Sequence, residues 1–124
     1  MLALGVGCRS ASEQFAERAA AHGLRAEVVT GAGFQHLVLS SPRAVGQTLH
    51  VYLDGDGTPM LGGYPTADPT PRDPLVLDLM ALDPTAAIYV GRPCYHGLSG
   101  APCSPELWTS ARYSEGVVTS MAAA

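Results

Sequence analysis

Residues 49–57 combine an apolar strand with a glycine-rich turn, in the order Leu-His-Val-Tyr-Leu-Asp-Gly-Asp-Gly. The chemistry that such a turn can do is carried by its backbone. Glycines let the chain turn sharply without a side chain filling the space in front of the amides. The N–H groups can then face a negative charge that develops during a reaction. The pattern therefore predicts an oxyanion-binding turn at Gly55, Asp56 and Gly57.

Two other interpretations of this turn are open. An Asp-Gly pair after an apolar strand is also the signal for a two-residue hairpin. A hairpin needs a second alternating strand directly afterwards, whereas residues 58–73 hold four prolines and two glycines. Asp54 and Asp56 could alternatively do acid–base chemistry or bind a metal. Because their side chains alternate in direction along the chain, we favour the turn and predict neither a metal site nor a cofactor.

Cys94 and Cys103 are separated by eight residues that include two glycines and a proline. So flexible a loop can close into a disulfide, which would stabilise the fold by about 2–3 kcal/mol. Two reduced thiols of a cytosolic protein are the alternative. A zinc site built from Cys94, His96 and Cys103 is disfavoured, because the spacing matches no common ligand pattern and a fourth ligand is missing.

The disulfide would indicate an exported protein, and the surroundings of Cys8 give a second hint of export. Residues 1–8, followed by Arg-Ser, resemble the end of a bacterial lipoprotein signal, in which small residues precede a cysteine that becomes lipidated. A basic segment and a full-length apolar segment are both missing from this stretch. The alternative is an ordinary N-terminal segment in which Cys8 is a free thiol.

Composition limits the classes of function. A chain of 124 residues with 47% hydrophobic composition forms one domain or part of one. The net charge of −4, with seven basic residues scattered singly, provides no basic stripe, so nucleic acid is not a predicted partner. No apolar run approaches the roughly 18 residues that span a bilayer, so no membrane span is predicted.

Periodicity predicts three helices and four strands. Ser10 and Glu13 form a capping box for the first helix, and Asp73 is the expected N-cap of the second, which should be mostly buried. Trp108, Val117 and Met121 are core candidates of the third. The expected helices cover residues 12–22, 74–82 and 105–121, and the expected strands cover residues 25–30, 35–40, 48–53 and 86–90.

This order predicts an α/β fold with antiparallel first strands, followed by parallel strands joined by crossover helices. In open α/β sheets, ligands bind beyond the carboxyl ends of the strands. The loops at residues 54–58 and 91–103 both leave such ends. We therefore expect them to lie together at one edge of the sheet.

Several motifs together resemble the N-terminal half of an α/β-hydrolase domain, over about residues 25–124. They are most similar to exported, serine-hydrolase-like bacterial proteins, although many of those have His where this chain has Asp54. The motifs are Val-Tyr-Leu-Asp-Gly-Asp-Gly at 51–57, Ile-Tyr-Val-Gly-Arg-Pro-Cys at 88–94, Cys103, Trp108 and Arg-Tyr-Ser at 112–114. The resemblance implies a small acyl substrate and oxyanion donors at the N–H groups of Asp56 or Gly57. It also divides the chain into an N-terminal segment, residues 1–24, with the short helix and a clipped export signal, and an incomplete hydrolase domain, residues 25–124.

The catalytic triad of this family is missing from the sequence. Its serine lies in a Gly-x-Ser-x-Gly elbow and is followed by an acid and a histidine. Ser99 in Gly-Leu-Ser-Gly-Ala is a near match, but no strand runs into it, and no Asp or His follows it. His22, His36, His50 and His96 are each expected to be structural. No catalytic residue is therefore predicted within this chain.

Two functions follow as hypotheses. The chain is either the N-terminal part of a serine hydrolase, inactive alone, or a non-catalytic binding or interaction module anchored to the envelope through Cys8. If a parallel sheet continues beyond Ala124, the last expected strand, residues 86–90, has an unpaired edge through which the chain could self-associate.

Overall fold

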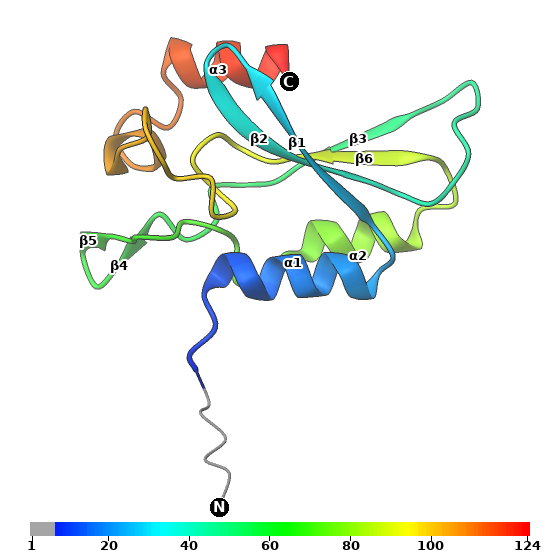
Figure 1. Ribbon diagram of the computed structural model, residues 1–124, viewed down its shortest axis with the longest axis horizontal. Helices are drawn as coiled ribbons and strands as arrows, with labels where there is room; N and C mark the ends of the chain where they lie inside the picture. The colour runs from blue at the N-terminus through cyan, green and yellow to red at the C-terminus, as the bar shows by residue number, and fades with distance from the viewer. Residues whose placement is uncertain (1–6) are drawn as a thin grey trace, which may run out of the picture.

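A mixed four-stranded sheet forms the centre of the protein, and a computed structural model describes residues 7–124 (Figure 1). Across the sheet the strands are β1 (Arg25–Gly31), β2 (Phe34–Ser40), β6 (Ala87–Val90) and β3 (His50–Leu53). Strands β1 and β2 pair antiparallel, β2 pairs antiparallel with β6, and β3 pairs parallel with β6. The predicted α/β class, with antiparallel strands first and a parallel pair after them, is confirmed.

Helix α1 (Ala11–Ala21) begins where the sequence predicts. Ser10 is the N-cap, its side chain accepts a hydrogen bond from the Glu13 amide, and the Glu13 side chain accepts one from the Ser10 amide. This reciprocal pair satisfies two amides that a helix start leaves without partners. Phe15 and Ala19 then lie on the face that packs against the sheet.

Helices lie on both faces of the sheet, although α3 covers only one end of its face (Figure 1). On one face, α1 and α2 (Leu75–Leu82) bury Phe15, Leu77 and Met80 against Leu39 and Tyr89 of the sheet. On the other face, α3 (Glu115–Ala123) packs against the end of β1. The contact is close at Gly31, where an added Cβ would lie 2.5 Å from the Ser120 carbonyl oxygen.

Two helix predictions are wrong in detail. Helix α2 is not mostly buried, because Leu75, Leu79 and Leu82 are exposed, and its N-cap is Pro74 rather than Asp73. The single helix expected over residues 105–121 is divided into η1 (Pro105–Trp108) and α3. The division occurs where the Arg112 carbonyl accepts a hydrogen bond from Arg92 and Ser114 adopts an extended conformation as the N-cap of α3.

The open edges of the sheet are β1 and β3. The expectation that residues 86–90 expose an edge is wrong, because β6 lies between β2 and β3 and is paired on both sides. The proline-rich segment after β3 also contains a small hairpin, β4 (Met60–Leu61) and β5 (Tyr64–Pro65). None of the helices within residues 7–124 has the length and apolar character needed to cross a membrane.

Candidate functional site

The parallel pairing of β3 with β6 brings two loops to one edge of the sheet. Residues 54–57 follow the end of β3, and residues 91–103 follow the end of β6. The loops are in contact, since Arg92 donates from Nη1 to Asp56 Oδ1 over 2.8 Å and the Tyr95 hydroxyl donates to the Asp56 carbonyl over 2.7 Å. The expected meeting of the two loops is therefore confirmed.

The turn at residues 54–57 does not connect two antiparallel neighbours. The hairpin of this segment lies further on, around Gly62 and Gly63, and among residues 7–124 β3 pairs only with β6. Gly57 has φ +63°, and a Cβ there would lie 2.2 Å from the Pro69 carbonyl oxygen. The Thr58 amide donates to that same oxygen over 2.9 Å. The close approach of the two segments therefore requires glycine at position 57.

The three amides of the predicted oxyanion-binding turn differ in their partners. The Gly55 N–H donates to Asp54 Oδ1 over 2.9 Å and is therefore occupied. Within residues 7–124, no hydrogen bond uses the N–H of Asp56 or of Gly57. These two amides are the donors that remain for an anionic group.

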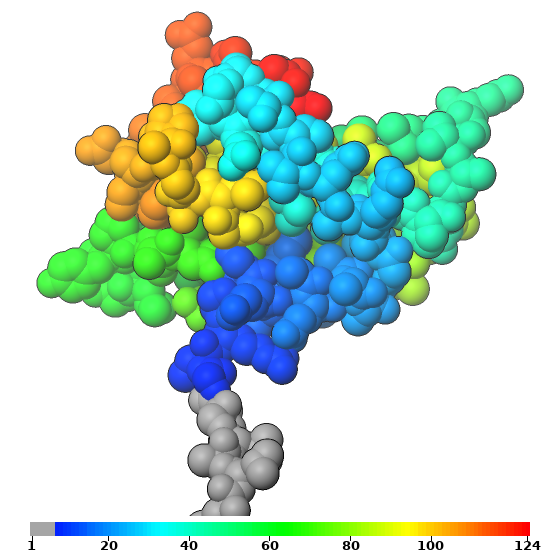
Figure 2. All heavy atoms as spheres, viewed as in Figure 1, coloured from blue at the N-terminus to red at the C-terminus, as the bar shows by residue number. Residues whose placement is uncertain are grey.

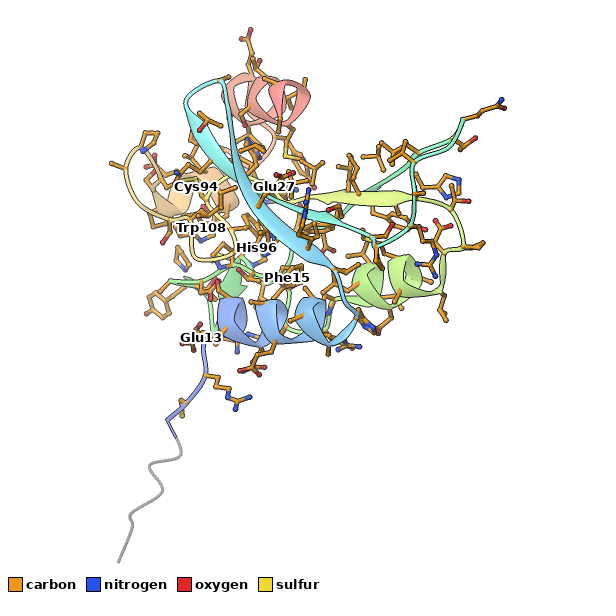
Figure 3. The ribbon with its side chains drawn as sticks, turned by 45° about the vertical axis from the view of Figure 1, so that its right-hand side comes forward. Glu13, Phe15, Glu27, Cys94, His96 and Trp108 are labelled. Atoms are coloured by element: carbon orange, nitrogen blue, oxygen red, sulfur yellow. A yellow bond between two sulfur atoms is a disulfide. The ribbon has the colours of Figure 1, made fainter. Side chains whose placement is uncertain are left out.

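Asp54 lies at the start of a partly buried polar chain. Its Oδ2 lies 3.5 Å from the Tyr89 hydroxyl, which lies 2.8 Å from His96 Nε2. Burial raises the pKa of Asp54 and lowers the pKa of His96 to about 4, so the His96 ring is neutral at pH 7. Figure 3 shows His96 beside Phe15, and their ring centroids are 4.4 Å apart.

Asp56 is held by a cluster of cationic and aromatic side chains. Its Oδ1 accepts from Arg92 and from the Tyr113 hydroxyl at 2.8 and 2.7 Å, and its Oδ2 lies 3.0 Å from Arg112 Nε. The guanidinium carbon of Arg92 also lies 5.1 Å from the centre of the Tyr113 ring. Asp56 is thereby fixed between the loop after β6 and the start of α3.

No role was predicted from the sequence for Arg92, Arg112 or Tyr113, although all three belong to the motifs of the resemblance. A usable signal was available. The chain has only seven basic residues, and two of them lie in the segments that follow the last predicted strand. Such sparse charges are expected to pair with the Asp54 and Asp56 carboxylates of the neighbouring loop.

The remaining histidines are tied to structural partners. His36 is buried with Nδ1 2.9 Å from the Gly91 carbonyl oxygen. His22 and His50 lie 2.9 and 2.6 Å from the carboxylates of Asp78 and Asp83 respectively. None of these contacts places a histidine beside a serine hydroxyl.

Ser99 lacks the surroundings of a nucleophile. It is exposed on the cysteine loop, residues 94–103, and it lines a hollow of about 170 Å³ together with Ser12 and Asp68. The residues lining this hollow, all within the described part of the chain, include no histidine. A histidine that could activate Ser99 is therefore missing from the lining of this hollow.

Cys94 and Cys103 form the predicted disulfide, with 5.6 Å between their Cα atoms. The bridge uses both sulfurs, so the alternative zinc site is excluded, and residues 7–124 contain no cluster of His, Cys, Asp and Glu that could hold a metal ion. In Figure 2 the yellow cysteine loop lies between α1 and the turn from β1 to β2. Cys8 is a free, exposed thiol, while residues 1–6 of the predicted signal lie outside the described residues.

Comparison of the chain with protein-family models, curated proteins and solved structures finds no match in any of the three.

Proposed function

We propose that this chain is the N-terminal part of a serine hydrolase of the α/β-hydrolase type, which cleaves an ester, amide or similar acyl bond. One observation carries the proposal. The turn at residues 54–57 leaves the carboxyl end of the parallel strand β3 with two amides, at Asp56 and Gly57, that have no partner within residues 7–124. In this class of enzyme, one oxyanion donor is an N–H of the loop between the third strand and the following helix.

The topology supports the same proposal. The third strand of this chain is β3, and the next long helix, α2, returns the chain to β6, which pairs parallel with β3. Oxyanion donors act on charge that develops at the reacting centre, and each contributes about 3–4 kcal/mol of transition-state stabilisation in a complete enzyme. Asp56 and Gly57 are the residues to which we assign this role.

The nucleophile, acid and histidine are assigned to polypeptide outside these 124 residues. The chain alone should therefore not turn over an ester faster than a buffer blank. This is checked with the purified chain and p-nitrophenyl acetate, using Ser99→Ala as the control. Turnover that Ser99→Ala abolishes would show that the nucleophile is present after all.

The oxyanion role is tested directly by NMR titration of the isotope-labelled chain with acetate, whose carboxylate imitates an oxyanion. We expect saturable shifts at the amides of Asp56 and Gly57, and none at Gly62 and Gly63 in the hairpin turn. Equal, linear shifts at all four amides would contradict the proposal, because they would indicate a nonspecific effect of the salt.

The coding frame separates this proposal from a non-catalytic binding module. Reading the gene past codon 124 should reveal a Gly-x-Ser-x-Gly motif within a few tens of codons. A stop codon directly after Ala124 would favour the module.

We further propose that the protein is exported. The Cys94–Cys103 disulfide supports this, because such bonds persist mainly in oxidising compartments. Cys8, exposed two residues before the N-cap of α1, is our assigned lipidation site. Intact mass of the membrane fraction should then show a lipid mass on the wild type and none on Cys8→Ser.

A further inference from the structure

A hollow of about 210 Å³ lies between the end of β3 and helix α3. Its apolar wall consists of Leu53 from β3 and of Val117, Val118 and Met121 from α3. Leu53 and Val118 are more than half exposed. Two apolar side chains thus face water in a concave site, and a concave apolar lining is one feature of ligand pockets.

The polar wall of the hollow has two guanidinium groups and one carboxylate, and Asp56 behind it supplies a second carboxylate. The wall is formed by Asp54, Arg92, Arg112 and Tyr113, and the two guanidinium groups already pair with Asp56 behind the wall. The Tyr113 hydroxyl also donates a hydrogen bond to the Asp56 carboxylate. Each guanidinium group lies within 3.0 Å of an Asp56 carboxylate oxygen, so the remaining surface of the hollow is mainly its apolar wall and favours an uncharged, apolar group.

The hollow adjoins the oxyanion-binding turn. Asp54 belongs to both, and three lining residues contact the Asp56 side chain at 2.7–3.0 Å. A carbonyl group bound at the turn would therefore have its chain beside the hollow. We propose that this hollow receives a short, uncharged aliphatic acyl chain of the substrate, an inference that rests on the proposed function.

The volume sets the expected chain length. An apolar cavity of about 150 Å³ accommodates benzene, which has six heavy atoms. A hollow of about 210 Å³ therefore takes an acyl group of about six to eight heavy atoms. Each buried methylene should strengthen binding about fourfold until the hollow is full, and further methylenes should add nothing.

The experiment titrates the isotope-labelled chain with methyl acetate, methyl butyrate, methyl hexanoate and methyl octanoate. We expect saturable amide shifts at Leu53, Val118 and Met121, with affinity rising to the hexanoate and then levelling off. Val118→Trp should fill the hollow and weaken hexanoate binding at least tenfold. Thr119→Trp is the matched control, because Thr119 is exposed on the same helix but does not line the hollow, and it should bind as the wild type does.

The same spectra separate this inference from the oxyanion role. Shifts at Leu53, Val118 and Met121 without shifts at Asp56 and Gly57 would support the hollow and contradict the oxyanion role. Acetate shifts at Asp56 and Gly57, together with no ester-induced shift at the hollow, would overturn the hollow alone. A dimer that Val118→Trp dissociates would also overturn it, because a second copy would then occupy the site.

Discussion

Asp56 joins the candidate oxyanion-binding turn to the rest of the protein through its side chain and its carbonyl group. Arg92, Arg112 and Tyr113 contact the carboxylate, and the Tyr95 hydroxyl donates to the carbonyl oxygen. Burial raises the pKa of Tyr95 to about 12, so this hydroxyl keeps its proton at pH 7 and remains a donor. A turn held from several sides presents its amides in one geometry, as oxyanion stabilisation requires.

Replacing Asp56 by Asn should destabilise the protein by about 1.5–3 kcal/mol, because hydrogen bonds to a charged group are lost while two guanidinium groups remain. Urea unfolding measures the change. Asp73→Asn is the control, since that carboxylate is 94% exposed and only pairs with Arg18 at 3.3 Å, and it should change stability by less than about 0.5 kcal/mol. Equal effects of the two substitutions would contradict the structural role of Asp56.

His96 gives the protein a pH dependence whose sign follows from its burial. The unfolded chain binds a proton near pH 6.5, whereas the folded protein does so only near pH 4. The stabilising contribution of the neutral ring is therefore complete above pH 6.5 and is lost as the pH falls toward 4. The full loss corresponds to about 3 kcal/mol.

The variant His96→Asn should remove this dependence between pH 6.5 and 4. Asn is suitable because position 96 has φ +59°, which Asn tolerates better than most residues. Asp54, whose pKa is raised from 3.8, has the opposite effect, because it makes the free energy of unfolding fall as the pH rises. The wild type and His96→Asn share this contribution. The difference between the free energies of unfolding of the wild type and His96→Asn, measured in urea at each pH, therefore isolates His96. A difference that stays constant from pH 6.5 to 4 would contradict the lowered pKa of His96.

At the scale of elements, local patterns predicted most of the fold. The strands containing residues 25–30 and 35–40 and the capping box at Ser10 and Glu13 depend on neighbouring residues, and the structure has them within one residue of the expected bounds. The division of residues 105–121 has one cause that local patterns do not contain, because the Arg92 side chain, distant in sequence, bonds the Arg112 carbonyl. It also had a local sign that the prediction overlooked, since Ser114 before Glu115 is a typical helix start.

For the candidate site, the sequence predicted which loops meet but not the side-chain contacts within them. Parallel strands implied that residues 54–58 and 91–103 meet, and they do. The sequence did not indicate that Asp54 would occupy the Gly55 amide, because this depends on one side-chain rotamer. The exposed leucines of α2 were also missed, since an apolar helix pattern does not state which face has a partner.

The disulfide should stabilise the loop that carries Tyr95 and His96. Replacing Cys94 and Cys103 together by Ala should cost about 2–3 kcal/mol in urea unfolding. Alkylation followed by intact mass checks the bridge itself. In the purified chain without a lipid on Cys8, we expect one modified cysteine, Cys8, when the oxidised chain is unfolded and three after reduction. Three modified cysteines without reduction would show that the bridge is absent.

At the scale of the whole molecule, the two edges of the sheet differ in their protection. Edge strands invite pairing with another chain unless charges, bulges or covering segments prevent it. The β1 edge carries Arg25 and Glu27, whereas residues 48–53 contain no Asp, Glu, Lys or Arg. The side chains of Val51 and Leu53 are 56% and 61% exposed. The β3 edge is thus the less protected one.

The chain should therefore self-associate through β3. The His50 amide bonds the Ala86 carbonyl on the β6 side, so the backbone groups of Val51 and Leu53 point to the open edge and can pair with a second strand. Sedimentation velocity over a hundredfold concentration range should show association that Val51→Lys reduces at least tenfold. Val28→Lys is the matched control, because Val28 is 51% exposed on the other edge strand, and it should associate as the wild type does. A wild type that stays monomeric throughout, or equal effects of both lysines, would contradict association through β3.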